Sequence, residues 1–241
     1  MIDLIVFDMA GTTVQDNHEV EFCFAEAALS TGLKVSSERI LSLQGYSKIE
    51  VFKMLWKEAS PNLSKINLTK KVNKSYLVFC QILENHYQNN DIYPTEGCLQ
   101  LFDYLRKNEI KIALTTGFYR KVTDIILQKL DWLEGLNEQR VGTVGSIIDV
   151  SVASDEVQYG RPKPDMILKA KRLLDVTDSQ KVIAIGDTPS DLIAGNAANC
   201  FKTFGVTNGT HSEQQLIEYQ SDGLFPSLIS FQNFLEKYNQ I

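Results

Sequence analysis

The sequence predicts an α/β protein: a doubly wound parallel sheet with a Rossmann-like core and an inserted helical cap domain. Short apolar runs typical of buried strands alternate with stretches of helical periodicity, which is the pattern of a parallel sheet with crossover helices. This alternation is interrupted once, after the first strand, by a long stretch with helical patterns and no convincing strand. With 241 residues, 44% of them apolar, the chain can bury a sizeable core.

Four short apolar runs are the predicted strands, at residues 4–7, 111–114, 182–185 and 201–206. Between them, apolar residues recur at helical spacing over residues 99–105 and 122–130. Pro164 favours a helix start ahead of a third apolar face at residues 167–174. The polar stretch 207–215 is predicted to be a loop.

The interruption is predicted to be a separate domain built of helices. Helical patterns cover residues 20–30, 47–58 and 68–87. We expect a cap domain at residues 17–90 and a core domain formed by residues 1–16 and 91–241, with hinges near residues 14–18 and 89–94.

Composition excludes several classes of protein. Lysine and arginine total 24 against 30 acidic residues, and a net charge of −6 argues against nucleic-acid or anionic-membrane binding. The 4 cysteines are far apart, without the spacing of a zinc ribbon or a disulfide scaffold. No apolar run reaches the ~18 residues of a membrane helix, and the N-terminus has the pattern of a core strand, not of a signal peptide. We expect a soluble, cytoplasmic protein.

Polar residues follow the predicted strands at one edge of the sheet. In an open parallel sheet, ligands bind beyond the carboxyl ends of the strands. The first and third strands are followed by acids, the second by Thr-Thr-Gly, and a loop before the third carries an arginine. The residues expected at this edge are Asp8, Asp187, Asp191, Thr116 and Arg161.

This set is suited to phosphoryl transfer. A carboxylate can attack phosphorus, hard oxygen ligands suit Mg²⁺, and a hydroxyl and a cation can hold phosphoryl oxygens. Each residue alone also has a structural explanation. Asp191 could be the acid of a capping box that begins at Thr188, Thr116 an ordinary strand exit, Arg161 a solvated loop cation and Asp8 a structural carboxylate. Their order and spacing together favour chemistry.

These motifs resemble those of the haloacid dehalogenase (HAD) superfamily. The resemblance spans nearly the whole chain, including a helical cap at the expected place. The matching segments are Asp8-x-Ala10-Gly11-Thr12, Thr116, Arg161 and Gly186-Asp187-Thr188-Pro189-Ser190-Asp191.

The resemblance implies an Mg²⁺-dependent hydrolase that acts through an aspartyl-phosphate. Asp8 would be nucleophile and metal ligand, Asp187 a further ligand, and Asp191 would support or join the metal shell. A backbone carbonyl at Met9 or Ala10 is expected as another ligand. The residues implied to hold the phosphoryl group are Thr12, Thr116, Gly117 and Arg161, the last in place of the lysine of most members.

Ala10 departs from most phosphatases of the superfamily, which carry a second aspartate at that position. A methyl group transfers no proton, so ester hydrolysis would lose much of an acid–base contribution of ~10²–10⁴-fold. The phosphonoacetaldehyde hydrolase (phosphonatase) branch departs in the same way and also has arginine at the place of Arg161. Its cap lysine, three residues after a glycine, resembles Gly45-x-x-Lys48. The resemblance implies that Lys48 forms a Schiff base, after which the leaving group departs as an enamine and needs no acid.

The surroundings predicted for Lys48 favour a neutral amine. Ser47 and Glu50 predict a capping box that places Lys48 in a first helical turn, where the helix dipole disfavours a cation. Its helical face carries apolar residues, and desolvation also lowers the pKa of an amine. Alternatively, Lys48 is a solvated lysine whose stem covers apolar surface.

Part of the aldehyde-handling pattern of the phosphonatases is missing. The residues that depart from it are Gln44, Val51, His18 and Phe118, which stand for methionine, histidine, cysteine and tyrosine. We expect His18 either to face the cleft at the hinge and take over proton transfer or to be an exposed hinge residue.

The function expected from the sequence is phosphonatase-like cleavage of a small carbonyl phosphonate such as phosphonoacetaldehyde. The alternatives are a phosphomonoesterase for sugar or nucleotide phosphates and a non-catalytic binding protein. The expected partner is a small phosphorylated or phosphonylated metabolite, and a homodimer through the cap is expected by analogy only.

Overall fold

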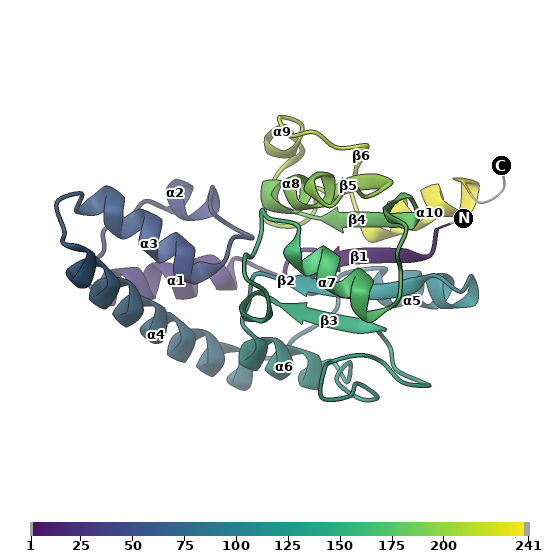
Figure 1. Cartoon of the computed structure of the whole chain (residues 1–241), viewed down its shortest axis with the longest axis horizontal. Coiled ribbons are helices and arrows are strands. Elements are labelled where there is room, and N and C mark those ends of the chain that lie inside the picture. The colour runs from purple at the N-terminus through teal and green to yellow at the C-terminus, as the bar shows by residue number, and fades with distance from the viewer. Residues whose placement is uncertain (1, 239–241) are drawn as a thin grey trace.

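The computed structural model describes residues 2–238 and shows a parallel sheet flanked by helices, with a group of four helices at one end (Figure 1). The α/β fold class predicted from the sequence is therefore confirmed. Among the described residues, no helix is both long enough and apolar enough to cross a bilayer.

The sheet has six parallel strands in the order β3-β2-β1-β4-β5-β6. Because all run the same way, their carboxyl ends meet at one edge, and β1 lies between β2 and β4. The strands are β1 (Leu4–Asp8), β2 (Lys111–Thr116), β3 (Val150–Ala153), β4 (Val182–Gly186), β5 (Lys202–Val206) and β6 (Gly223–Phe225).

The four predicted strands are confirmed as β1, β2, β4 and β5, whereas β3 and β6 were not predicted. Both are edge strands of only 4 and 3 residues. The buried central strands are continuous apolar runs, but β6 is half-buried and β3 contains a serine, so neither produces the same pattern.

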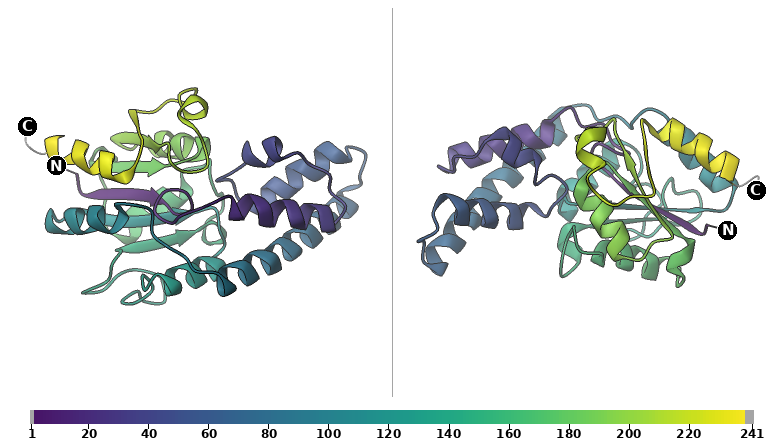
Figure 2. Two further views of the ribbon diagram at one scale, coloured as in Figure 1. Left: turned by 180° about the vertical axis from the view of Figure 1, so that it is seen from behind. Right: turned by 90° about the horizontal axis from the view of Figure 1, so that it is seen from above.

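Helices cover both faces of the sheet (Figure 2). Alternate residues of β1 point into two separate apolar cores, Ile5 and Phe7 into one, and Leu4 and Val6 into the other. The first core is covered by α5 (Cys98–Lys107), α6 (Arg120–Lys129) and α10 (Leu228–Tyr238), and the second by α7 (Asp165–Leu173) and α8 (Pro189–Ala197). The predicted loop 207–215 contains the start of a short helix, α9 (Glu213–Leu216), and two 3₁₀ turns lie at Ser154–Glu156 and Ser179–Lys181.

The cap helices pack around stacked aromatic rings. Phe24 and Phe52 lie parallel with centroids 4.2 Å apart, and Phe79 lies 5.7 Å from Phe24. Trp56 donates a hydrogen bond to Ser75 across the same core, at 2.9 Å. The cap helices are α1 (Glu19–Ser30), α2 (Ser37–Leu41), α3 (Lys48–Ala59) and α4 (Lys65–Asn89). The short α2 was not predicted.

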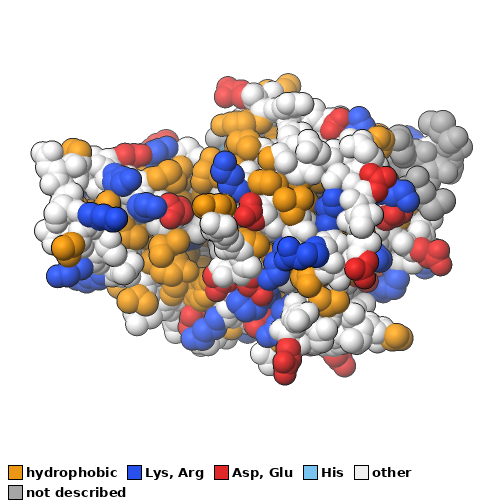
Figure 3. Space-filling view, viewed as in Figure 1, with side chains coloured by type: hydrophobic (Ala, Val, Ile, Leu, Met, Phe, Trp, Pro, Cys, Tyr) orange, Lys and Arg blue, Asp and Glu red, His pale blue; other side chains and the backbone are white. Residues whose placement is uncertain are grey.

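Two linkers that run side by side connect the cap to the core. Gln15 N–H donates to the Tyr93 carbonyl and Thr95 N–H to the Thr13 carbonyl, both at 3.0 Å. The division into residues 17–90 and the rest stays a prediction. Figure 3 shows apolar side chains gathered over the cap helices and where they meet the core, among interspersed charges of both signs.

Candidate active site

Three buried carboxylates meet at the carboxyl edge of the sheet. Asp8 ends β1, Asp187 follows the neighbouring β4, and Asp191 lies in the first turn of α8. One carboxylate oxygen from each lies within 4.8 Å of the other two. The predicted capping box of α8 is present: the Thr188 N–H and hydroxyl donate to Asp191 at 3.0 and 2.6 Å. Asp191 therefore caps the helix and also joins the cluster.

Arg161 is the cation of this cluster. Its guanidinium is buried, pairs with Asp8 at 2.5 Å and also pairs with Asp191. When all three carboxylates are ionised, one guanidinium leaves two negative charges unbalanced. Burial accordingly raises the pKa of Asp8 to about 6, although Arg161 opposes the shift, and burial raises the pKa of Asp187. A divalent cation with a preference for oxygen ligands fits the position and charge of this donor set.

Hydroxyl and amide donors fix the Asp187 carboxylate. Thr12 donates to one oxygen at 3.2 Å, and the amide and hydroxyl of Thr210 donate to the other at 2.7 and 2.8 Å. Gly11 has a φ of 87°, and a Cβ there would lie 2.2 Å from the same carboxylate. Thr12 was predicted to hold a phosphoryl group; the structure places its hydroxyl on Asp187.

The Met9 carbonyl is used by a backbone turn and not by the carboxylate cluster, so the prediction that it is a metal ligand is wrong. It accepts hydrogen bonds from the amides of Thr12, Thr13 and Val14, at 2.8–3.1 Å. An oxygen saturated in this way by the turn has no lone pair to offer an ion. Ala10 lines the pocket, and its carbonyl stays the predicted backbone ligand.

Two of the predicted phosphoryl-binding residues, Thr116 and Gly117, line the pocket at the end of β2. The Thr116 hydroxyl accepts a hydrogen bond from Phe118 N–H at 3.1 Å, which leaves its own hydrogen to donate elsewhere. Gly117 lies against the cap, because a Cβ there would come within 2.9 Å of the Gly45 carbonyl. Gly45 has a φ of 77°, and a Cβ on it would lie 2.2 Å from Ser190 Oγ. The cap loop that contains Gly45 therefore packs between the end of β2 and α8.

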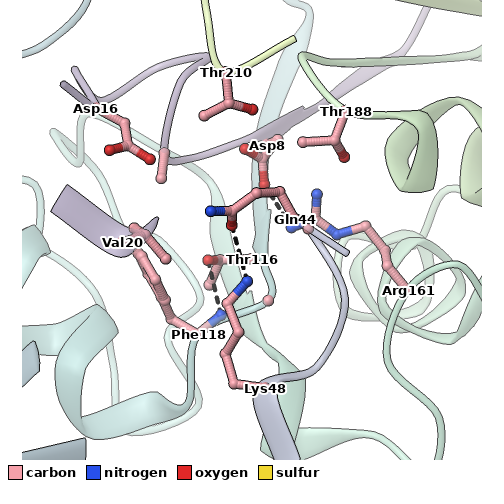
Figure 4. Close-up of a pocket in the computed structure, with 13 residues that line it drawn as sticks. Asp8, Asp16, Val20, Gln44, Lys48, Thr116, Phe118, Arg161, Thr188 and Thr210 are labelled. Atoms are coloured by element: carbon pink, nitrogen blue, oxygen red, sulfur yellow. Dashed lines mark hydrogen bonds and ion pairs between the residues drawn. The ribbon is translucent and has the colours of Figure 1, made fainter. Parts of the chain in front are cut away.

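Lys48 extends from the cap into the same pocket (Figure 4). It is 7% exposed, and its Nζ donates to Gln44 Oε1 at 3.0 Å. Burial lowers the pKa of Lys48 to about 8, with a smaller contribution from Arg161 and opposition from Asp16 and Asp8. Its place in the first turn of α3 is as predicted. The alternative of a solvated lysine is wrong.

The capping box predicted for α3 is absent. Ser47 makes no side-chain capping hydrogen bond, and Glu50 pairs with Lys53 at 2.9 Å. The low pKa of Lys48 therefore comes from its burial between cap and core, as also predicted, with a smaller contribution from Arg161 and without the capping box.

The pocket lies between the two parts of the chain and has little free volume. The core contributes Asp8, Thr116, Arg161 and Thr188, and the cap contributes Val20, Gln44, Gly45 and Lys48. Its free volume is about 30 Å³, room for a few water molecules but not for a phosphorylated metabolite.

His18 does not face this pocket, which corrects the first expectation for it. Its side chain is 68% exposed and pairs with Glu21 at 3.3 Å. With a φ of 70° at the N-cap of α1, its backbone turns the side chain outward. Asp16, two residues earlier, lines the pocket instead. It belongs to no motif, and the only signal for it in the sequence is an acid in the predicted hinge.

The sequence is similar to those of known proteins. Residues 2–199 match the family model of haloacid dehalogenase-like hydrolases. Phosphonoacetaldehyde hydrolase from Bacillus cereus (strain AH187) is 29% identical over 243 residues, which cover 93% of this chain and 83% of that protein. The enzyme of the same name from Latilactobacillus sakei is 27% identical and is aligned over 82% of this chain and 72% of its own length.

Solved structures show the same fold. A hydrolase from Pseudomonas syringae superposes with a TM-score of 0.77 at 19% identity, over 98% of both chains. A phosphonoacetaldehyde hydrolase-like protein from Oleispira antarctica also gives a TM-score of 0.77, at 18% identity, over 99% of this chain and 93% of its own.

Mg²⁺ is expected to stabilise the protein through the carboxylate cluster. At a concentration about 100-fold above Kd, binding adds about 2.7 kcal/mol to the free energy of unfolding, which raises the midpoint by about 5–10 °C in a chain of this size. Asp187→Asn should lose this shift in thermal unfolding with Mg²⁺ or EDTA. Asp103→Asn, which removes an exposed carboxylate paired with Arg106, should retain it. An undiminished shift in Asp187→Asn would contradict the metal site.

Lys48→Met is expected to be more stable than the wild type at pH 7. Because burial lowers the pKa of Lys48 to about 8, the folded state binds the proton of the amine less tightly than the unfolded chain does. The resulting destabilisation is complete below pH 8 and disappears as the pH rises past the unfolded value of 10.5. We expect a gain of about 1–2 kcal/mol at pH 7, since the loss of the Gln44 hydrogen bond offsets part of it. Urea denaturation measures this gain, and a less stable variant at pH 7 would show that the amine is not destabilised by burial.

Proposed function

Since the chain belongs to the haloacid dehalogenase-like hydrolase family, we propose that it cleaves the carbon–phosphorus bond of a small carbonyl phosphonate such as phosphonoacetaldehyde. The observation that carries this proposal is the buried Lys48 amine in one pocket with Asp8. An aldehyde forms an imine with such an amine, which weakens a neighbouring carbon–phosphorus bond, whereas cleavage of the phosphorus–oxygen bond of an ester gains nothing from it.

Asp8 is the proposed nucleophile toward phosphorus. Its carboxylate lies at the end of β1, held by Arg161, and the Thr116 hydroxyl has a hydrogen available for a phosphoryl oxygen. Attack forms an aspartyl-phosphate and breaks the bond from phosphorus to carbon. Arg161 stays beside the reacting oxygens and counters their growing negative charge.

Lys48 is proposed to convert the substrate aldehyde into an iminium, which is a stronger electrophile. Its low pKa leaves a substantial fraction of neutral amine near pH 8 to condense with the substrate aldehyde. The iminium accepts the electron pair of the breaking carbon–phosphorus bond, and the leaving group departs as an enamine. This chemistry needs no acid for an alkoxide, which is consistent with the methyl group at Ala10.

Mg²⁺ is the cofactor proposed for the cluster. Asp8, Asp187 and the Ala10 carbonyl would hold it, and Asp191 would support or join this set. When bound, it would neutralise the excess negative charge and let an anionic substrate approach an anionic nucleophile. The threonine donors on Asp187 keep one carboxylate of this set in a single orientation.

Hydrolysis of a phosphate ester is the second candidate. The phosphoryl-handling residues are complete without Lys48, whereas Gln44 and Val51 depart from the aldehyde-handling pattern of the phosphonatases. These departures favour a sugar or nucleotide phosphate as the alternative substrate.

Borohydride reduction separates the two candidates. With phosphonoacetaldehyde, sodium borohydride should convert the imine into a stable secondary amine, which peptide mass spectrometry should locate on Lys48. Lys48→Arg should lower the rate of phosphate release from the phosphonate by at least about 10²-fold and retain stabilisation by Mg²⁺. An unmodified Lys48 together with rapid Mg²⁺-dependent hydrolysis of phosphate esters would overturn the phosphonate proposal.

A further inference from the structure

We propose that Asp16 is the acid–base residue that serves Lys48, in the place of the carboxylate that Ala10 lacks. This inference rests on the proposed function, because it assigns a proton donor to the condensation of Lys48 with a carbonyl. It concerns a residue outside the motifs that identify the family.

Asp16 reaches the pocket from the linker that joins core and cap. Its carboxylate lies among the lining residues that include Asp8, Ala10 and Lys48, and Figure 4 shows it turned toward the interior of the pocket. His18, the alternative proton carrier of this segment, points to solvent. Among the described pocket residues, Asp16 is therefore the carboxylate that lies outside the cluster of Asp8 and Arg161.

The start of α1 holds Asp16 in position and keeps a proton on it. Glu19 N–H donates to Asp16 Oδ1 at 2.9 Å, and the two side chains are hydrogen-bonded to each other. Asn17 donates to Glu19 from its backbone amide and, at 3.1 Å, from its side chain. Although burial alone would raise the pKa of Glu19, the hydrogen bonds from Asp16 and Asn17 lower it. This arrangement favours the ionised form of Glu19 and the protonated form of Asp16.

The pKa values of Asp16 and Lys48 both lie near 8. Burial, Glu19 and Asp187 raise the pKa of Asp16 to about 8, which is also the value to which burial lowers the pKa of Lys48. Asp16 is the charged group that most opposes this lowering, ahead of Asp8, while Arg161 reinforces it. An acid whose pKa lies near the working pH can both donate and accept a proton, which favours acid–base catalysis.

Lys48 and Asp16 would form the iminium in two stages. The neutral Lys48 amine adds to the carbonyl carbon, a carbon–nitrogen bond forms, and a proton moves from nitrogen to oxygen. Asp16 then donates its proton to the hydroxyl group, which leaves as water while the nitrogen electron pair forms the iminium. The Asp16 carboxylate remains beside the iminium as its counter-ion. After the carbon–phosphorus bond breaks, water protonates the enamine at carbon to give the product iminium, whose hydrolysis reverses these steps and returns the proton to Asp16.

A test that does not require the natural substrate is reductive alkylation of Lys48. The full-length protein is treated at pH 7 with acetaldehyde and excess cyanoborohydride, and the rate of ethylation at Lys48 is followed by peptide mass spectrometry. Asp16→Asn retains an oxygen acceptor for Glu19 N–H but has no acidic proton. We expect this variant to alkylate Lys48 about 10²-fold more slowly. Asp91→Asn, an exposed acid in the second linker, should alkylate Lys48 at the wild-type rate.

The direction of the change separates catalysis from simple electrostatics. At pH 7 Asp16 mostly holds its proton, so the neutral Asn leaves the charge beside Lys48 almost unchanged, and any charge that is lost lowers the pKa of Lys48. A purely electrostatic role therefore predicts wild-type or slightly faster alkylation. Asp16→Ala provides a second test. Added formate should restore the rate of alkylation at Lys48 in this variant and leave the alkylation of surface lysines unaffected. Wild-type or faster alkylation in Asp16→Asn, or absence of rescue in a folded Asp16→Ala, would overturn the assignment.

Phosphate release from phosphonoacetaldehyde distinguishes the two proposals. If the wild type releases no phosphate but its Lys48 alkylation depends on Asp16, the phosphonate function is wrong and the assignment of Asp16 is supported. If the wild type releases phosphate and Asp16→Asn does so at the same rate, the function is supported and the assignment of Asp16 is wrong.

Discussion

The burial of three carboxylates around a single guanidinium is the constraint on which the rest of the structure depends. Like charges removed from water destabilise a fold unless opposite charge and hydrogen bonds compensate them. Much of the neighbouring sequence supplies this compensation: Arg161 bridges two carboxylates, threonine donors hold Asp187, and the capping box of α8 holds Asp191. The remaining negative charge is what suits the site to a divalent cation and, with it, to an anionic phosphoryl group.

The cap adds a second buried ionisable group, Lys48, to the carboxylate cluster of the core. The cap places Lys48 in a pocket with little free volume, and burial there lowers the pKa of its amine. Gly45 permits this arrangement, since its left-handed backbone and missing side chain let the cap loop lie against α8. Asp16 stands in the linker itself, so any movement of the cap also bears on the proposed proton donor.

The parts predicted correctly from the sequence are those governed by local patterns and by the geometry of a parallel sheet. Central strands are continuous apolar runs, and residues that follow them must meet at one edge, which placed Asp8, Asp187 and Asp191 together. Edge strands β3 and β6 are too short to produce such a pattern. The Met9 carbonyl and the His18 side chain were misassigned because their directions depend on turn hydrogen bonds and on the backbone conformation at the start of α1. The backbone conformation at the start of α1 also turns Asp16 toward the pocket, and no sequence motif predicts this orientation.

The central claim, that Asp8 receives the phosphoryl group, is tested most directly by rapid acid quench of a single turnover with Mg²⁺ and phosphonoacetaldehyde, followed by peptide mapping. A phosphoryl group on the peptide that contains Asp8, formed and lost at rates compatible with turnover, is the predicted result. Phosphate release at full rate with no phosphoryl group on Asp8 would contradict it.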